Sequence, residues 1–350
     1  MDPVLVGVQL ALGALGVLGV SASEPGQGLE HGLRVLFALG ITLVVSRVSP
    51  NKIVRLSPFA YVGVLFLLVL VLFIGISPTG STAKRWLLIG GFTLQPSELM
   101  KVTVIAYLAA FFYNHLGDWQ IWRPMVVIGL AAGAIVVEPD ISTALFIFLL
   151  AMAMMLAAGT SFVRLLSIGT FAAMIAVVVA GSYVGQLSYV GDRLSGFADL
   201  WGAQTQTDGL SYQASRARIT LMRAGLFGVG PGRPLNVPEA DTDMIAVAIG
   251  HALGLLGIAT LLGLYLVIAV RGMAIAGSLS GPGSLLAAGA TIYICGQAAL
   301  NLLVSAGLLP VTGIPLPLVS YGFNSLVSVA IALGFIHSSY RVARAEGAIT

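Results

Sequence analysis

The sequence predicts an all-α, polytopic membrane protein, and three observations indicate that class. Hydrophobic residues make up 58% of the 350 residues and charged residues only 9%, whereas a soluble domain carries about 25% charged residues. The apolar residues fall into stretches of about 20, the length that crosses a bilayer as a helix. The 43 glycines and 15 prolines follow no collagen period, and membrane helices tolerate both residue types. A water-soluble enzyme and a disordered chain are excluded.

Ten apolar stretches follow one another and predict ten transmembrane helices in a single domain, residues 1–350. Residues 1–4 lack the positive charge of a signal peptide, so we expect the first stretch to be an uncleaved span. The single cysteine, Cys295, allows no intrachain disulfide. The predicted spans are Pro3–Val20, Gly32–Val48, Phe59–Gly75, Ser97–Tyr113, Arg123–Val137, Asp140–Gly159, Phe162–Ser188, Asp243–Val270, Leu285–Leu308 and Leu326–Ser338.

The positive charges of the short loops predict the orientation, because cytoplasmic loops carry an excess of Lys and Arg. If the N-terminus is cytoplasmic, the short outer loops hold Lys84 and Arg85, and Arg34 lies near the second span. The opposite orientation would place eight cations outside. We therefore expect both termini to be cytoplasmic (N-in/C-in). The inner loops and tail then hold Arg47, Lys52, Arg55, Arg123, Arg164, Arg271, Arg341 and Arg344.

Two segments are not predicted to span the membrane. Residues 76–96 contain Trp86 and the pair Gly90-Gly91, and we expect an outer loop anchored at the interface by Trp86. Residues 189–243 form a large extracytoplasmic loop between the seventh and eighth spans, with apolar patches such as residues 219–222 that favour an amphipathic interfacial helix. A loop of this length in a compact chain is usually functional.

Ionisable groups within predicted spans are costly and mark candidate functional sites. Glu98 and Lys101 follow Ser97, a suitable N-cap, and lie three residues apart on one helix face. Asp140 opens the sixth span and Asp243 the eighth. In the N-in topology all of them lie at the outer side, where helix N-termini attract anions. The alternatives are a structural ion pair for Glu98 and Lys101 and helix caps for the two aspartates.

Several short motifs together resemble one protein family. Their order and spacing over nearly the whole chain are similar to those of the SEDS (shape, elongation, division and sporulation) family, which includes RodA and FtsW. The form of residues 84–86 and 309–317 looks more like RodA than FtsW. The motifs are Gly80 with Lys84-Arg85-Trp86, residues 95–99 with Lys101, Glu138-Pro139-Asp140 with Thr143-Ala144, Arg193 with Phe197, Tyr212-Gln213, Pro238-Glu239 with Thr242-Asp243, and residues 309–322.

The chain departs from the family pattern around the last aspartate. The family usually has His-Thr-Asp-Phe-Ile-Phe, where this chain has residues 241–246 as Asp-Thr-Asp-Met-Ile-Ala. Residues 250–254 and 322–325 differ as well. Asp243 itself is present, so the resemblance still implies activity.

The resemblance implies a peptidoglycan glycosyltransferase that polymerises lipid II, an undecaprenyl-pyrophosphate-linked donor, into glycan strands. It implies a location in the bacterial cytoplasmic membrane, with the reaction at its outer face, and a role in cell elongation and shape, or in division if the chain is FtsW-like. The implied partners are a class B penicillin-binding protein, the lipid II substrate and membrane lipids. We expect no nucleic acid partner.

The implied chemistry assigns roles to the outer residues. Asp243 is the candidate general base for the attacking sugar hydroxyl. Cations stabilise the departing pyrophosphate, and Glu98 holds Lys101 in place. A divalent metal, Mg²⁺ or Mn²⁺, bound at Asp140 or Asp243 is a further expectation. The candidate substrate and pyrophosphate residues are Glu98, Lys101, Asp140, Arg193, Gln213, Arg216, Arg218, Glu239, Ser320 and Tyr321.

Two other functions fit parts of the sequence. A flippase for the same lipid would favour charges at the membrane midplane and inverted repeats, and the sequence shows neither. A scaffold that recruits a transpeptidase without catalysis is the second alternative, and the altered residues 241–246 favour it.

Overall fold

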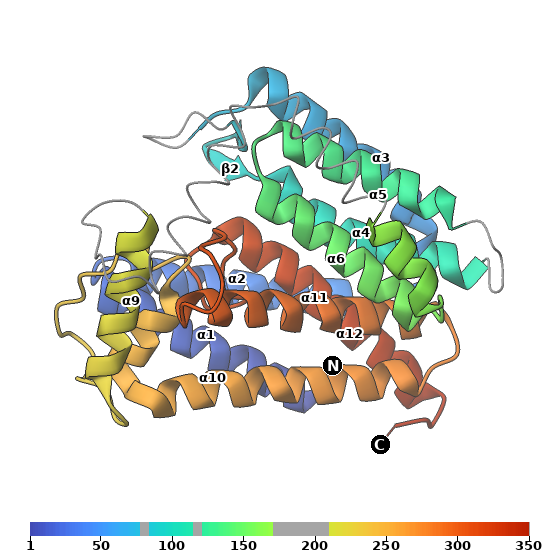
Figure 1. Ribbon diagram of the computed structural model, residues 1–350. Coiled ribbons are helices and arrows are strands. Elements are labelled where there is room, and N and C mark those ends of the chain that lie inside the picture. The colour runs from blue at the N-terminus through green and yellow to red at the C-terminus, as the bar shows by residue number, and fades with distance from the viewer. Residues whose placement is uncertain (78–83, 115–120, 171–209, 350) are drawn as a thin grey trace.

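The computed structural model describes residues 1–77, 84–114, 121–170 and 210–349. It is a bundle of long helices with one small hairpin (Figure 1). The helices are α1 (Pro3–Ser23), α2 (Gly28–Ser46), α3 (Pro50–Ile74), α4 (Pro96–Asn114), α5 (Trp122–Val137), α6 (Ile141–Ala157), α9 (Leu210–Ala224), α10 (Ile245–Gly277), α11 (Pro282–Ser305) and α12 (Phe323–Ala345), and the strands are β1 (Leu87–Ile89) and β2 (Phe92–Leu94).

The predicted membrane class is confirmed. Within the described residues, six helices are long and apolar enough to cross a membrane, and α5 and α6 are shorter apolar helices. Nine of the ten predicted spans overlap a described helix. One of these helices is α4, which overlaps the fourth predicted span. The seventh, Phe162–Ser188, is helical over residues 162–170 and then passes outside the described residues. The total of ten spans stays a prediction.

Two predicted helix starts are wrong. The third span was expected from Phe59, but α3 begins at Pro50 after the N-cap residue Ser49, because proline fits the first helical position. Lys52 and Arg55, predicted in a loop, are therefore helical. Ser97 is not the cap of α4, since that helix already begins at Pro96.

The outer loop before α4 contains the hairpin. β1 pairs antiparallel with β2, with Leu87 opposite Leu94. Gly90 and Gly91 both have positive φ angles, 58° and 88°, as a tight two-residue hairpin turn requires. The glycine pair was visible in the sequence, but the strands beside it are only three residues long. The hairpin is a small addition to an otherwise helical fold.

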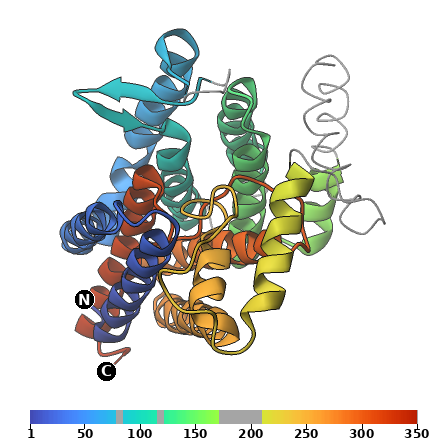
Figure 2. The same ribbon diagram turned by 90° about the vertical axis from the view of Figure 1, so that its left-hand side faces the viewer.

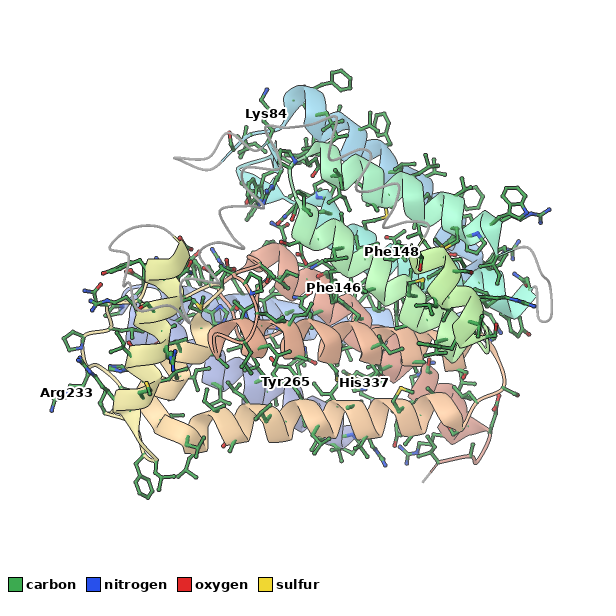
Figure 3. The ribbon with its side chains drawn as sticks, viewed as in Figure 1. Lys84, Phe146, Phe148, Arg233, Tyr265 and His337 are labelled. Atoms are coloured by element: carbon green, nitrogen blue, oxygen red, sulfur yellow. The ribbon has the colours of Figure 1, made fainter. Side chains whose placement is uncertain are left out.

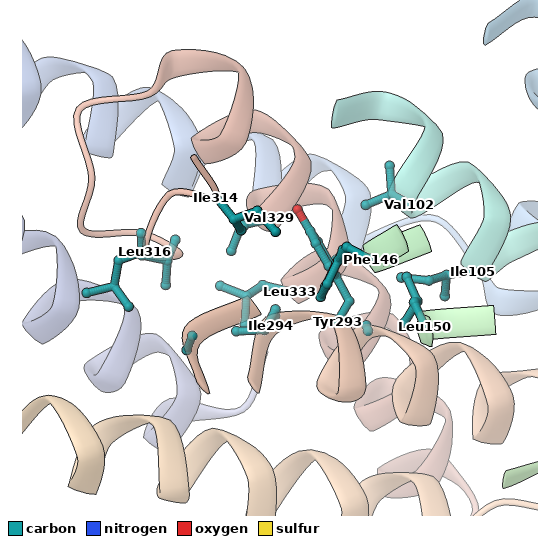
Figure 4. Close-up of a cluster of buried hydrophobic side chains, with 14 of the residues drawn as sticks. Val102, Ile105, Phe146, Leu150, Tyr293, Ile294, Ile314, Leu316, Val329 and Leu333 are labelled. Atoms are coloured by element: carbon teal, nitrogen blue, oxygen red, sulfur yellow. The ribbon is translucent and has the colours of Figure 1, made fainter. Parts of the chain in front are cut away.

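The core lies where α4, α6, α11 and α12 meet. Figure 4 shows Phe146 of α6 and Tyr293 of α11 among side chains from α4 and α12, and their ring centroids are 6.0 Å apart. Gly289 lets α11 approach closely, since a Cβ there would lie 2.6 Å from Cε of Met154 and 2.8 Å from Cγ2 of Ile105. Small residues commonly allow such close contact between membrane helices.

Asp2 contacts the second halves of α10 and α12, so both chain ends lie at one end of the bundle, and Figure 2 shows them on the same side of the molecule. Oδ2 of the buried Asp2 accepts a hydrogen bond from Nε of Arg271 at 2.8 Å. The backbone N–H of Asp2 donates to Nδ1 of His337 in the second half of α12 at 3.1 Å. This arrangement is what the predicted topology requires, although the membrane side stays a prediction. We call this end the inner end.

The opposite, outer end is covered by α9 and the loop that follows it. Figure 3 shows Arg233 of this loop at the left margin, away from His337. The loop packs against a break in α10 at Gly254, which has φ 67° and ψ −156°. The backbone N–H of Val229 donates to the carbonyl of His251 at 2.9 Å, and the N–H of Leu255 donates to the carbonyl of Gly225 at 3.0 Å. The loop thus pairs with backbone groups at the break.

Candidate functional site at the outer end of the bundle

Glu98 and Lys101 form the predicted ion pair in the first turns of α4. Nζ of Lys101 donates to Oε1 of Glu98 at 2.7 Å and to Oε1 of Gln297 at 3.0 Å. Oε2 of Glu98 accepts from the Ser328 hydroxyl at 3.0 Å. The two charged residues are only 1% and 4% exposed. A buried pair needs such additional hydrogen bonds, because desolvation of the two charges is costly.

One face of α11 connects this pair to the segment before α10. Gln297 and Asn301 lie four residues apart and therefore on the same helix face. Nε2 of Gln297 donates to the Pro315 carbonyl at 2.8 Å. Nδ2 of Asn301 donates to the carbonyls of Asp243 at 2.8 Å and Ile314 at 2.9 Å. The same two turns of α11 thus hold both Lys101 and the backbone of Asp243.

Sequence reasoning missed Gln297 and Asn301. Both are almost fully buried, and they interrupt an apolar stretch that was predicted as the ninth span. Uncharged polar side chains within a span are a weaker signal than ionised ones, but two amides at a spacing of four residues would have identified this face.

Asp243 lies in a short non-helical segment, residues 238–244, and is half-buried. The N-cap position of α10 is Met244, so Asp243 precedes it by one residue. A Cβ on Gly313 would lie 3.6 Å from Oδ2 of Asp243, which places the carboxylate beside the loop before α12. The segment turns through Glu239, whose φ is 54°. Thr242 donates its hydroxyl to Oε2 of the exposed Glu239 at 2.9 Å.

Asp140 caps α6, as the alternative interpretation predicted. Its Oδ1 accepts from the Thr143 N–H at 3.2 Å. Arg85 fixes the turn before it, because its guanidinium donates to the carbonyls of Glu138 and Pro139. The carboxylate of Glu138 is buried, and neither oxygen has a hydrogen-bond partner within the described part of the chain. Burial raises the pKa of Glu138 to about 8, with a further contribution from the charge of Asp140.

The long loop contributes α9 to this end of the molecule. Gln213 is buried, and its Nε2 donates to the Pro238 carbonyl at 3.4 Å. The Arg216 guanidinium lies 5.5 Å from the ring centroid of Tyr212. Arg218 is exposed. Arg193 lies outside the described residues. α9 therefore contacts the segment that carries Asp243 through Gln213, and two of the predicted arginines lie on this helix.

Ser320 and Tyr321 contact the protein itself. The Ser320 hydroxyl donates to the Thr242 carbonyl at 2.7 Å, and the Tyr321 hydroxyl donates to Oε2 of Glu30 at 2.8 Å. Arg34 donates to the Tyr321 carbonyl at 3.0 Å. Sequence reasoning did not identify Glu30 as part of this end.

Among the residues that the structure describes, no group of three or more His, Cys, Asp or Glu side chains could hold a metal ion. Asp140 already caps a helix, and the neighbouring Glu138 is enclosed. The described donor set therefore does not fit a divalent metal by itself. The metal stays a prediction, and no chemical step below uses one.

Comparison with known proteins places the chain in a family. The family model described as "Cell cycle protein", for FtsW, RodA and SpoVE, matches residues 16–345. A probable peptidoglycan glycosyltransferase FtsW of Coxiella burnetii is 32% identical over 362 residues, covering 96% of this chain and 95% of the relative. The corresponding protein of Alcanivorax borkumensis is 30% identical, covering 88% and 82%.

Two solved structures have the same fold. One is from work on the structural coordination of polymerization and crosslinking by a peptidoglycan synthase complex, with a TM-score of 0.80, 25% identity and 97% of each chain covered. The other is the rod shape determining protein RodA of Thermus thermophilus, with a TM-score of 0.69, 25% identity and coverage of 96% and 95%. From its fold and from the family match over nearly its whole length, the chain belongs to the FtsW, RodA and SpoVE family, the SEDS family.

Proposed function

We propose that this chain is a peptidoglycan glycosyltransferase that polymerises lipid II at the outer face of the bacterial cytoplasmic membrane. Its curated relatives are named peptidoglycan glycosyltransferases, which supports the activity. One observation in the structure carries the assignment of the site. One face of α11 binds both the backbone carbonyl of the half-buried Asp243 and the buried ammonium group of Lys101, at the same end of an apolar bundle.

In the proposed reaction, the 4-hydroxyl of one sugar attacks the anomeric carbon of a lipid-linked sugar. The new C–O bond forms while the bond to the pyrophosphate breaks, and the hydroxyl proton passes to the carboxylate of Asp243 as general base. A single displacement converts the α-linked donor into a β linkage, as in inverting carbohydrate enzymes. Asn301 holds the backbone of Asp243 and so helps to set the position of this carboxylate.

The departing pyrophosphate carries the electrons of the broken bond and needs nearby positive charge. Lys101 contributes its charge from inside the bundle, where Glu98 and Gln297 fix the ammonium group. Arg216 and Arg218 contribute theirs from α9, and we assign the same role to Arg193. Asp140 shapes the outer wall by fixing the start of α6.

We further propose a class B penicillin-binding protein as the partner. The support is the similar chain from a complex that coordinates polymerization and crosslinking. The similar proteins include both FtsW and RodA. Complementation of depleted strains would distinguish the roles, and the RodA-like form of residues 84–86 predicts rescue of cell elongation rather than division.

The function is tested with purified protein and lipid II, with and without Mg²⁺ or Mn²⁺. Glycan chains resolved on a gel are the expected product. The same protein in vesicles is assayed for lipid II translocation. Translocation without polymer would indicate a flippase, and neither activity would indicate a scaffold. Polymer that forms only with added metal would support the predicted metal.

A further inference from the structure

We propose that the outer end of α2 positions the general base, through a clamp formed by Glu30, Arg34 and Tyr321. We call these three residues the α2 clamp. The inference rests on the proposed function, in which Asp243 accepts the proton. It assigns a role to two residues of α2 and changes the role expected for Tyr321 from substrate contact to positioning.

Three contacts fix Tyr321 on α2. Its hydroxyl donates to Oε2 of Glu30 at 2.8 Å. Its carbonyl accepts from Nη1 of Arg34 at 3.0 Å. Its ring centroid lies 4.1 Å from the Arg34 guanidinium carbon, close enough for a cation–π interaction. Arg34 also pairs with Glu30 one helical turn away, so the two charged side chains hold each other as well as the tyrosine.

The fixed Tyr321 in turn holds the segment before α10. Its backbone N–H donates to the carbonyl of Asp241 at 2.9 Å. The adjacent Ser320 donates its hydroxyl to the carbonyl of Thr242 at 2.7 Å and accepts from the N–H of Leu316 at 2.8 Å. Asn301 holds the next carbonyl, that of Asp243. The carbonyls of the three consecutive residues 241–243 therefore accept hydrogen bonds from two elements, the loop before α12 and helix α11.

This arrangement favours positioning over stability as the role of the clamp. The side chains of Arg34 and Glu30 are 25% and 56% exposed, and partly exposed ion pairs add little to stability. Two residues before the first of these carbonyls, Glu239 has a left-handed backbone, which is disfavoured for a residue with a side chain. A strained segment keeps one conformation only when its surroundings determine it. Through Tyr321, the clamp helps to keep this segment in its one conformation.

The variants Arg34→Gln and Tyr321→Phe test the proposal, with Arg341→Gln as the matched control. Nη1 of Arg341 donates to the Ser46 carbonyl at 2.7 Å, so the control removes an equivalent arginine–carbonyl contact between α12 and α2 at the inner end. We expect Arg34→Gln to lower kcat for lipid II polymerisation about tenfold, since small displacements of catalytic groups have large effects. Tyr321→Phe lowers kcat less, and KM and melting temperature stay unchanged in both.

A second readout does not depend on activity. Hydrogen exchange of the Tyr321 amide, followed by mass spectrometry, reports its bond to Asp241. We expect faster exchange in Arg34→Gln and wild-type exchange in Arg341→Gln. Unchanged exchange, or a raised KM with unchanged kcat, would overturn the clamp. Failure of the wild-type protein to polymerise lipid II would overturn the proposed function instead, while the exchange result would still decide whether the clamp holds the segment.

Discussion

Lys101→Met is the sharpest test of the buried ion pair. At the observed separation of 2.7 Å from Glu98, the Coulomb attraction is about 6 kcal/mol at an effective dielectric constant of 20. Desolvation of each buried ion costs several kcal/mol, so the pair as a whole contributes little net stability. Removing only the lysine leaves the carboxylate charged and buried. We expect the free energy of unfolding to fall by about 3–5 kcal/mol.

The assay is reversible unfolding of the purified protein in mixed micelles. The double variant Glu98→Gln/Lys101→Met leaves no buried charge and keeps an acceptor for Ser328, so most of the lost stability should return. Arg34→Met removes one partner of the partly exposed Glu30–Arg34 pair, together with the contacts of Arg34 to Tyr321, and should cost much less than Lys101→Met. A cost below about 1 kcal/mol for Lys101→Met would refute the reasoning. So would a double variant whose cost equals the sum of its single variants.

Three further predictions concern other parts of the outer end. Gly254→Ala should lower the free energy of unfolding by about 1–3 kcal/mol or more. The backbone at this position suits only glycine, and a Cβ there would lie 2.3 Å from the backbone N of Gly228. The control is Gly263→Ala on the same helix, which meets no atom within 4 Å and should be neutral. Asn301→Leu should lower kcat by about tenfold to a hundredfold in the polymerisation assay, because the carbonyl of the base residue loses its donor. The third prediction concerns Glu138→Gln, with the free energy of unfolding measured as a function of pH. The carboxyl of Glu138 binds its proton more tightly in the folded than in the unfolded protein, so the wild type loses stability as the pH rises from 4.5 to about 8. The variant should therefore become more stable relative to the wild type across this range, and the difference should stay constant above about pH 8.

The sequence was sufficient for features that depend on neighbouring residues. Stretches of about 20 apolar residues predicted the helices. The spacing of Glu98 and Lys101 predicted their ion pair, and the position of Asp140 after a proline predicted its cap. In each case the interacting groups lie within four residues of each other, so helix geometry alone determines the contact.

Contacts between distant segments could not be predicted in the same way. Gln297 reaches Lys101 across 196 residues, and Tyr321 reaches Glu30 across 291. Both depend on which helices pack together, and a nearly uniform apolar composition carries little information about that packing. The glycine at the break in α10 was equally hidden, because its need for a positive φ arises only once the loop at Gly228 packs against it.

The central claim is that Asp243 is the general base, and one measurement tests it most directly. The initial rate of glycan formation from lipid II is compared for wild type, Asp243→Asn and Glu24→Gln, with equal amounts of folded protein. Glu24 is an exposed carboxylate at the outer end of α1 and serves as the control. We predict that Asp243→Asn makes no detectable glycan and melts at the wild-type temperature, while Glu24→Gln keeps the wild-type rate. Glycan formation by Asp243→Asn at a rate close to that of wild type would contradict the account.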